Sequence, residues 1–166
     1  MLECGIGTND PARVSSMGAE GRPGASLRVW RDYFPAARII GIDIDDSILF
    51  TEERIETHAV DQTSAESIRL FVERLPPEAM FDIVIDDGLH TPEAAFSLFA
   101  GLSHRLAQDG LWVIEDVPVR RLARYAEVFR RAAPGFALRA FVLHRRGSAV
   151  GDNCLLVATR DEPAAP

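Results

Sequence analysis

The chain contains no lysine. All 18 basic residues among its 166 are arginine, and 25 acidic residues give a net charge of −7 at pH 7. Because arginine stays protonated at physiological pH, a histidine or a carboxylate must act wherever the protein needs a proton acceptor. The acidic balance also disfavours nucleic acid as a partner. Eight arginines gather in the last third, and we interpret them as the solvated face of a helix and its neighbour: Arg120, Arg121, Arg124, Arg130, Arg131, Arg139, Arg145 and Arg146.

Cysteine and long apolar runs are scarce as well. The two cysteines, Cys4 and Cys154, lie in short apolar runs, where a cysteine is usually a small buried hydrophobe, and this usage indicates a reducing, cytoplasmic environment. No apolar stretch approaches the roughly 20 residues that a membrane-spanning helix needs. Residues Met1–Glu3 show neither the basic region nor the apolar core of a secretory signal. We therefore expect a soluble protein that does not enter a membrane.

Short apolar runs alternate with segments of helical period, which predicts a parallel sheet covered by helices. Only Gly147–Asn153 separates the last two runs, so these should pair as an antiparallel hairpin at one edge. The expected fold is α/β, a doubly wound, Rossmann-like, mostly parallel sheet of seven strands. Residues 1–160 would form this domain and 161–166 a disordered tail. The strands are expected at Leu2–Cys4, Arg38–Asp43, Ile55–Val60, Phe81–Ile85, Leu111–Ile114, Leu138–Leu143 and Leu155–Thr159.

Helical period predicts helices over Ala25–Phe34, Ser64–Leu75 and Val119–Arg131, and another that begins at Thr91 with an apolar stripe reaching Leu106. Thr63 and Glu66 have the spacing of a capping box, and Pro92 suits a first helical turn. Residues 9–24 are polar, aperiodic and rich in glycine and proline, which predicts a loop.

The first predicted strand runs directly into a glycine pair, Gly5 and Gly7, which allows the backbone to turn tightly against a ligand. A dinucleotide-binding fingerprint would need a third glycine where Asp10 stands and a helix that follows at once. Glu3 would repel a pyrophosphate but suits a ligand with an ammonium group, as in S-adenosylmethionine. An NAD-dependent oxidoreductase is therefore the weaker alternative.

Acidic residues stand at the ends of three further strands. Asp43 follows the second strand, where an acid can accept both ribose hydroxyls of a nucleoside. Asp61 and Gln62 follow the third strand and could meet the adenine edge, and Asp86 ends the fourth. The alternative for each acid alone is that it caps the next turn. Their repetition at successive strand ends favours nucleoside binding.

A second acidic cluster combines Asp87 after the fourth strand with Glu115 and Asp116 after the fifth. Because neighbouring parallel strands end at one edge, three carboxylates would meet there and suit Mg²⁺, which prefers oxygen ligands. His90 lies three residues after Asp87, and since the reference pKa of histidine is about 6.5, a histidine there can accept a proton. A lone histidine at such a place is more often a hydrogen-bonded structural residue, but the adjacent carboxylates favour a catalytic base.

Five stretches resemble the class I S-adenosylmethionine-dependent methyltransferases: LECGIG, GASLRVWRDYFPAARIIGIDID, DQTS, FDIVIDDGLH and GLWVIEDV. They are most similar to the metal-dependent sugar O-methyltransferases of macrolide biosynthesis, and the cephalosporin hydroxylase-like proteins look similar too. The resemblance implies Mg²⁺ ligands at Asp87, Glu115 and Asp116, with His90 as general base in the place where catechol O-methyltransferases have a lysine. It implies cofactor contacts from Glu3, Gly5, Asp43 and Gln62, and a contact of Ser26 with the cofactor's carboxylate.

The sequence departs from that family in two places. Relatives usually have a further segment before the first strand, and Leu89 stands where the family often has a small polar residue. We expect transfer of a methyl group from S-adenosylmethionine to a hydroxyl acceptor, a sugar of a glycosylated natural product in an antibiotic pathway. A non-catalytic nucleoside-binding module of the same fold is the main alternative. The oligomeric state is open, a homo-oligomer included.

Overall fold

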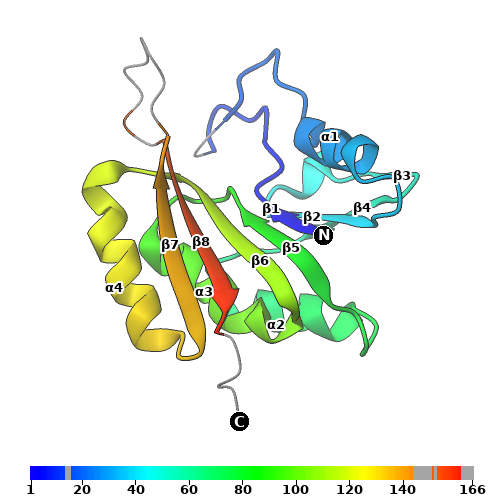
Figure 1. The fold of residues 1–166 in the computed structure, drawn as a ribbon. Helices are drawn as coiled ribbons and strands as arrows, with labels where there is room; N and C mark the ends of the chain where they lie inside the picture. The colour runs from blue at the N-terminus through cyan, green and yellow to red at the C-terminus, as the bar shows by residue number, and fades with distance from the viewer. Residues whose placement is uncertain (14–15, 144–150, 152, 162–166) are drawn as a thin grey trace.

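Eight strands form one sheet in the described part of a computed structural model, which covers the chain except residues 14–15, 144–150, 152 and 162–166. The strand order across the sheet is β3-β4-β2-β1-β5-β6-β8-β7 (Figure 1). The strands are β1 (Leu2–Cys4), β2 (Ile39–Asp43), β3 (Thr51–Glu52), β4 (Ile55–Ala59), β5 (Phe81–Asp86), β6 (Leu106–Val117), β7 (Phe136–Val142) and β8 (Cys154–Arg160).

The five strands from β4 to β6 across the sheet run parallel. From β1 the chain adds β2 and β4 on one side and then β5 and β6 on the other. The direction of winding thus reverses between β1 and β5, and in open α/β sheets ligands bind outside the carboxyl ends of the strands at such a point. The topology alone therefore places the candidate site beside Cys4 and Asp86, the ends of these two strands.

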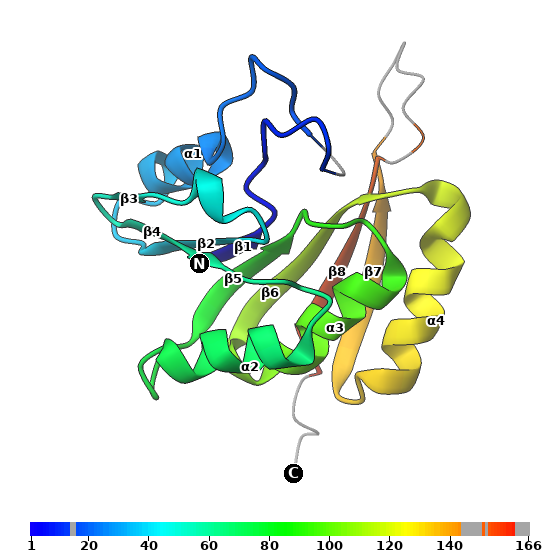
Figure 2. The same ribbon diagram turned by 180° about the vertical axis from the view of Figure 1, so that it is seen from behind.

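Helices cover both faces of the sheet (Figures 1 and 2). On one face lie α2 (Ala65–Arg74), α3 (Pro92–Leu102) and α4 (Leu122–Ala132), and α1 (Ala25–Tyr33) lies on the other, against β2 and β4. The larger core lies under the three helices. There the ring of Phe99 meets those of Trp112 and Phe129 edge-on, with centroids 5.0 Å apart in both pairs. Both cysteines are buried and unpaired, as expected.

The sheet has one strand more than the seven expected. Strand β3 is only two residues long and pairs antiparallel with β4, too short to show a period. Strand β6 begins five residues earlier than expected, at Leu106, because a register shift in its pairing with β5 admits the exposed polar residues Gln108 and Asp109. Leu106 therefore opens a strand, and α3 ends at Leu102 instead of extending its stripe.

The predicted capping box is wrong. The N-cap of α2 is Ser64, whose hydroxyl accepts the backbone N–H of Ser67 at 3.2 Å. Thr63 donates to Asp61 instead, and Glu66 pairs with Arg69 one turn later. Thr63 and Ser64 both have a hydroxyl group that can cap a helix, so the spacing to Glu66 alone led to the wrong prediction.

The other helix starts agree better with the sequence. Thr91 caps α3 by accepting the N–H of Ala94, with Pro92 in the first turn as predicted. Helix α4 begins three residues later than expected, after a 3₁₀ turn over Val119–Arg121. Of the eight arginines interpreted as a solvated face, the six that the structure describes are exposed, and Arg145 and Arg146 lie outside the described residues.

The expected antiparallel hairpin is confirmed. Strands β7 and β8 pair in continuous register from Phe136 opposite Arg160 to Val142 opposite Cys154. The loop predicted at Gly147–Asn153 and the predicted tail 161–166 fall mostly outside the described residues. No helix in the described ranges has the length and apolar character that a membrane crossing would require.

Replacing Leu98 of α3 by alanine should destabilise the fold by about 2–5 kcal/mol, because its side chain is fully buried and the lost contacts leave a cavity. Leu70 of α2 is 41% exposed and provides the matched control, with a cost below about 1 kcal/mol. Urea unfolding of both variants measures the difference. Equal losses would show that the three-helix face does not carry the main core.

Candidate functional site

A cavity of about 740 Å³ opens at the carboxyl ends of the parallel strands, a volume in the range of small-molecule and cofactor sites. Nine of the twelve site residues predicted from the sequence line it, and Glu3, Asp86 and Glu115 do not. The nine come from the loop after β1, the start of α1, the ends of β2 and β6, and the segments after β4 and β5: Gly5, Gly7, Ser26, Asp43, Asp61, Gln62, Asp87, His90 and Asp116.

The glycine loop after β1 packs directly against the segment after β5. Gly5 has φ +83°, and a Cβ there would lie 2.2 Å from the carbonyl oxygen of Asp87. Only glycine tolerates both the conformation and the approach. Asp43 fixes the same loop from the other side, because its carboxylate accepts the N–H of Ile6 at 2.9 Å and that of Asp45 at 2.9 Å.

Glu3 lies beneath the cavity wall rather than in it. It is 3% exposed, and its carboxylate accepts hydrogen bonds from the Trp30 indole, at 2.6 Å, and from the Ser26 hydroxyl. Burial raises its pKa, and these two hydrogen bonds counteract the rise. Glu3 therefore attaches α1 to β1 and supports Ser26, which does line the cavity. Its contact with an ammonium group stays a prediction.

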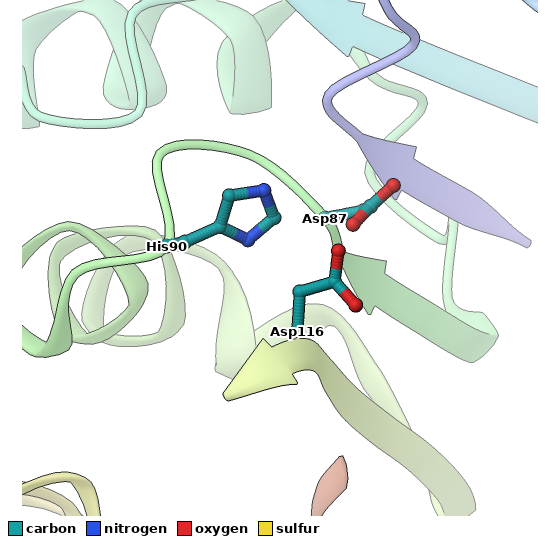
Figure 3. A group of neighbouring side chains, drawn as sticks. All are labelled: Asp87, His90 and Asp116. Atoms are coloured by element: carbon teal, nitrogen blue, oxygen red, sulfur yellow. The ribbon is translucent and has the colours of Figure 1, made fainter. Parts of the chain in front are cut away.

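Three side chains converge beside the glycine loop: Asp87 from the end of β5, His90 from the segment before α3 and Asp116 from β6 (Figure 3). One potential ligand atom from each lies within 4.8 Å of the others. His90 and Asp116 have φ of 53° and 49°, in a region that non-glycine residues rarely occupy and that concentrates at functional sites.

The carboxylates around Asp87 repel one another. Burial, followed by the charges of Glu115 and Asp116, raises the pKa of Asp87 to about 8. Burial likewise raises the pKa of Glu115, again with a contribution from Asp116. A divalent cation would remove this repulsion, and carboxylate oxygens are the ligands that Mg²⁺ takes. The donor set therefore fits such an ion.

Glu115 is not a member of the converging group. Successive residues of a strand point to opposite faces, and the group contains Asp116 and His90 instead. Glu115 nevertheless lies close enough to raise the pKa of Asp87 and of Glu3 by its charge. The metal-binding roles of Asp87, Glu115 and Asp116 stay predictions, and so do the cofactor contacts.

The sequence did not indicate that the loop at residues 9–24 forms part of the cavity. Ala12, Arg13 and Met17 line it, and Met17 packs so closely on Gly7 that a Cβ there would lie 2.1 Å from the Met17 sulfur. The loop is held to the end of β2, where Thr8 donates to the buried Asp45. An aperiodic loop gives no sequence signal for its position. The one available hint was Arg13, a basic residue that could have been expected to lie near the acids of the cavity.

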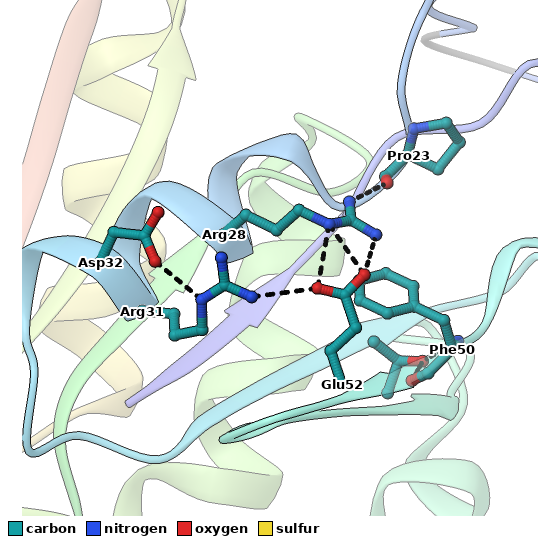
Figure 4. A network of polar contacts seen from close by, with 7 residues as sticks. Pro23, Arg28, Arg31, Asp32, Phe50 and Glu52 are labelled. Carbon is teal, nitrogen blue, oxygen red and sulfur yellow. Dashed lines mark hydrogen bonds and ion pairs between the residues drawn. The ribbon is translucent and has the colours of Figure 1, made fainter.

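An ion-pair network supports the outer wall of the site (Figure 4). From α1, Arg28 and Arg31 both bind Glu52 of β3, at 2.6 and 3.1 Å. The Arg28 guanidinium also lies 4.3 Å from the ring centroid of Phe50 and donates to the carbonyl oxygen of Pro23 at 3.0 Å. The network ties the start of α1, and with it the cavity wall, to the edge of the sheet.

No family model matches the chain. It is 40% identical over 114 residues to the mycinamicin VI 2''-O-methyltransferase of Micromonospora griseorubida, a match covering 66% of the chain and 28% of that relative. It is 36% identical over 117 residues to the 8-demethyl-8-alpha-L-rhamnosyl tetracenomycin-C 2'-O-methyltransferase of Streptomyces olivaceus, covering 70% and 28%. The chain thus spans little more than a quarter of the length of these relatives.

The structure resembles that of the MycE methyltransferase from the mycinamycin biosynthetic pathway, determined in complex with Mg and SAH. The TM-score is 0.66 at 28% sequence identity, and the match covers 99% of this chain and 46% of that one. The similarity therefore extends over the whole sheet.

Alanine at Gly5 should destabilise the protein more than alanine at Gly135. Both residues have φ above +80°, so both variants incur the cost of a left-handed L-residue, about 1–2 kcal/mol. Nothing lies within 4 Å of a Cβ at Gly135, whereas at Gly5 the Asp87 backbone must move. Urea unfolding measures both losses, and equal values would contradict the close approach of the two loops.

The stability of the metal-free protein should depend on Asp87 in a defined direction. A raised pKa means that the folded state binds this proton more tightly than the unfolded state, so ionisation lowers the free energy of unfolding between about pH 4 and pH 8. The free energy of unfolding of Asp87→Asn should therefore increase relative to that of the wild type as the pH rises. Urea unfolding in EDTA measures the difference.

The matched control for this effect is Asp45→Asn. Hydrogen bonds from Ser47 and Thr8 lower the pKa of Asp45, so its ionised form stabilises the fold above about pH 4. The free energy of unfolding of the variant should therefore decrease relative to that of the wild type as the pH rises. Parallel pH profiles for the two variants would contradict the uncompensated charge at Asp87.

Proposed function

The chain belongs to the class I S-adenosylmethionine-dependent methyltransferases, and we propose that it transfers a methyl group from S-adenosylmethionine to a hydroxyl on a sugar of a glycosylated natural product, with Mg²⁺ as a cofactor. The observation that carries the proposal is the convergence of Asp87, His90 and Asp116 within 4.8 Å beside a cofactor-sized cavity. The named relatives support the acceptor class, since one is an O-methyltransferase of mycinamicin VI and the other of a rhamnosyl tetracenomycin-C.

The cavity wall divides into two parts by chemistry. Gly5, Gly7 and Ser26 would receive the methionine part of the cofactor, where the backbone can approach closely. Asp43 would accept the ribose hydroxyls with the capacity left on its oxygens after binding two backbone N–H groups. Asp61, on the wall at the end of β4, would lie toward the adenine.

Asp87 and Asp116 would hold the Mg²⁺ ion, with Glu115 close enough to join them. When bound, the ion lowers the pKa of an acceptor hydroxyl and orients its oxygen. His90 takes the hydroxyl proton, a role to which an imidazole is suited. With no lysine in the chain, this histidine is the base that the site offers. The acceptor oxygen then attacks the methyl group in line.

The remaining assignments follow from the same function. We infer a small-molecule hydroxyl acceptor as the partner rather than nucleic acid or membrane, and a cytoplasmic location. The two sides of the reaction can be tested separately, because binding of the cofactor needs no acceptor.

Titration calorimetry of S-adenosylmethionine into the protein with Mg²⁺ should give micromolar affinity. Asp43→Asn should weaken it at least about tenfold, because one ribose acceptor is lost, worth about 1.4 kcal/mol. Asp46→Asn is the matched control, since Asp46 is exposed three residues on and does not line the cavity. Absence of binding by the wild type would contradict the methyltransferase assignment.

His90→Gln should lower the rate of methyl transfer by about 10²–10⁴-fold, the usual contribution of a general base. The assay follows labelled methyl from S-adenosylmethionine into glycosylated macrolides and glycosylated aromatic polyketides. His104→Gln is the control, because His104 lies in the turn after α3 and not among the residues that line the cavity. Equal rates for His90→Gln and the wild type would show that another group takes the proton.

A further inference from the structure

The side chain of Gln62 is used at both ends by the segment that follows β5. It is 7% exposed, its Nε2 donates to Oδ1 of Asp86 at 3.1 Å, and its Oε1 accepts the backbone N–H of Leu89 at 2.6 Å. The sequence placed this amide at the adenine edge. Both of its polar atoms are instead engaged with the segment that carries Asp87 and leads to His90.

The same segment is held at further points around the amide. Oδ1 of Asp86 also accepts the N–H of Gly88 at 3.3 Å. A Cβ at Gly88 would lie 2.0 Å from Oε1 of Gln62, so the glycine backbone packs flat against the amide. The side chains of Gln62 and Asp86 thus hold the backbone from Asp86 to Leu89, together with the hydrogen bond from the Asp87 N–H to the carbonyl oxygen of Cys4. This segment ends immediately before His90, whose φ of 53° needs such support.

The donors and acceptors determine the orientation of the amide. The N–H of Leu89 can only donate, so the oxygen of Gln62 must face it and the NH₂ group must face Asp86. Asp86 is 2% exposed, and its other carboxylate oxygen has no partner among the described residues. Gln62 is therefore the side chain that donates to this buried acid while it holds Leu89.

We propose that Gln62 is a positioning residue, which fixes the backbone from Asp86 to Leu89 and thereby holds Asp87 and His90 in place to meet Asp116. The roles of these three residues rest on the proposed function. Because Gln62 also lines the cavity, its buried amide connects the wall of the proposed cofactor site to the group formed by Asp87, His90 and Asp116.

The test uses Gln62→Met, which keeps the length of the side chain and loses both hydrogen bonds. Hydrogen exchange of the Leu89 amide should speed up at least about tenfold. The affinity for Mn²⁺ alone, measured by electron paramagnetic resonance without cofactor, should fall at least about tenfold, and by more than the affinity for S-adenosylmethionine. Thr63→Val is the matched control, because Thr63 lines the same wall and its hydroxyl donates to Asp61 rather than to the β5 segment.

Unchanged Leu89 exchange and Mn²⁺ affinity, with weaker cofactor binding, would overturn the proposal. Gln62 would then be a contact of the adenine of the cofactor. A wild type that binds no Mn²⁺ would contradict the proposed function. The exchange of the Leu89 amide would still decide whether Gln62 holds the segment after β5. If the methionine variant does not fold, Gln62→Glu at acidic pH provides the second test, since a protonated carboxyl group can still accept from Leu89 and can donate to Asp86 in place of the amide. Its Leu89 exchange should stay near that of the wild type, and exchange as fast as in an unprotected loop would overturn the proposal.

Discussion

Strand β1 pairs in parallel with both β2 and β5, and the whole site depends on this arrangement. It brings the loop after β1 against the segment after β5, where the N–H of Asp87 donates to the carbonyl oxygen of Cys4 at 2.9 Å and Gly5 leaves no room for a Cβ. The cavity therefore lies between the glycine loop and the segment that carries Asp87 and leads to His90. Separate elements could not bring these two segments so close.

Charge is the second constraint. The corner gathers Glu3, Asp86, Asp87, Glu115 and Asp116, and the charges of the other four all add to the rise in the pKa of Asp87. Such a cluster costs stability in the absence of a cation, and the divalent ion proposed for this site would offset that cost. The network of Arg28, Arg31 and Glu52 keeps the arginines of α1 occupied at the outer edge.

The sequence predicted the elements where local physics decides them. Strand β1 was placed at its observed bounds and the start of α3 at Thr91, because an apolar run and a hydroxyl cap before a proline are local signals. It failed where tertiary contacts decide. Strand β3 exists only through pairing with β4, and the choice of Ser64 over Thr63 as cap depends on a competing bond to Asp61.

The same division holds for the site. Strand ends identify which residues reach the carboxyl edge, so nine of the twelve predicted residues line the cavity. The sequence cannot say which of two adjacent acids on β6 turns toward His90, since this depends on the unusual φ of Asp116. Nor could it show that Glu3 would be occupied by Trp30 and Ser26, or Gln62 by Leu89.

The central claim is that the acids of this corner hold a divalent cation beside the base. A crystal of the protein grown with Mn²⁺ and S-adenosylmethionine would test it most directly, by anomalous scattering from the metal. The account predicts one strong peak bridging carboxylate oxygens of Asp87 and Asp116, at the short distances of oxygen ligation, with the cofactor in the adjoining cavity. A filled cofactor cavity with no metal at these two carboxylates would contradict it.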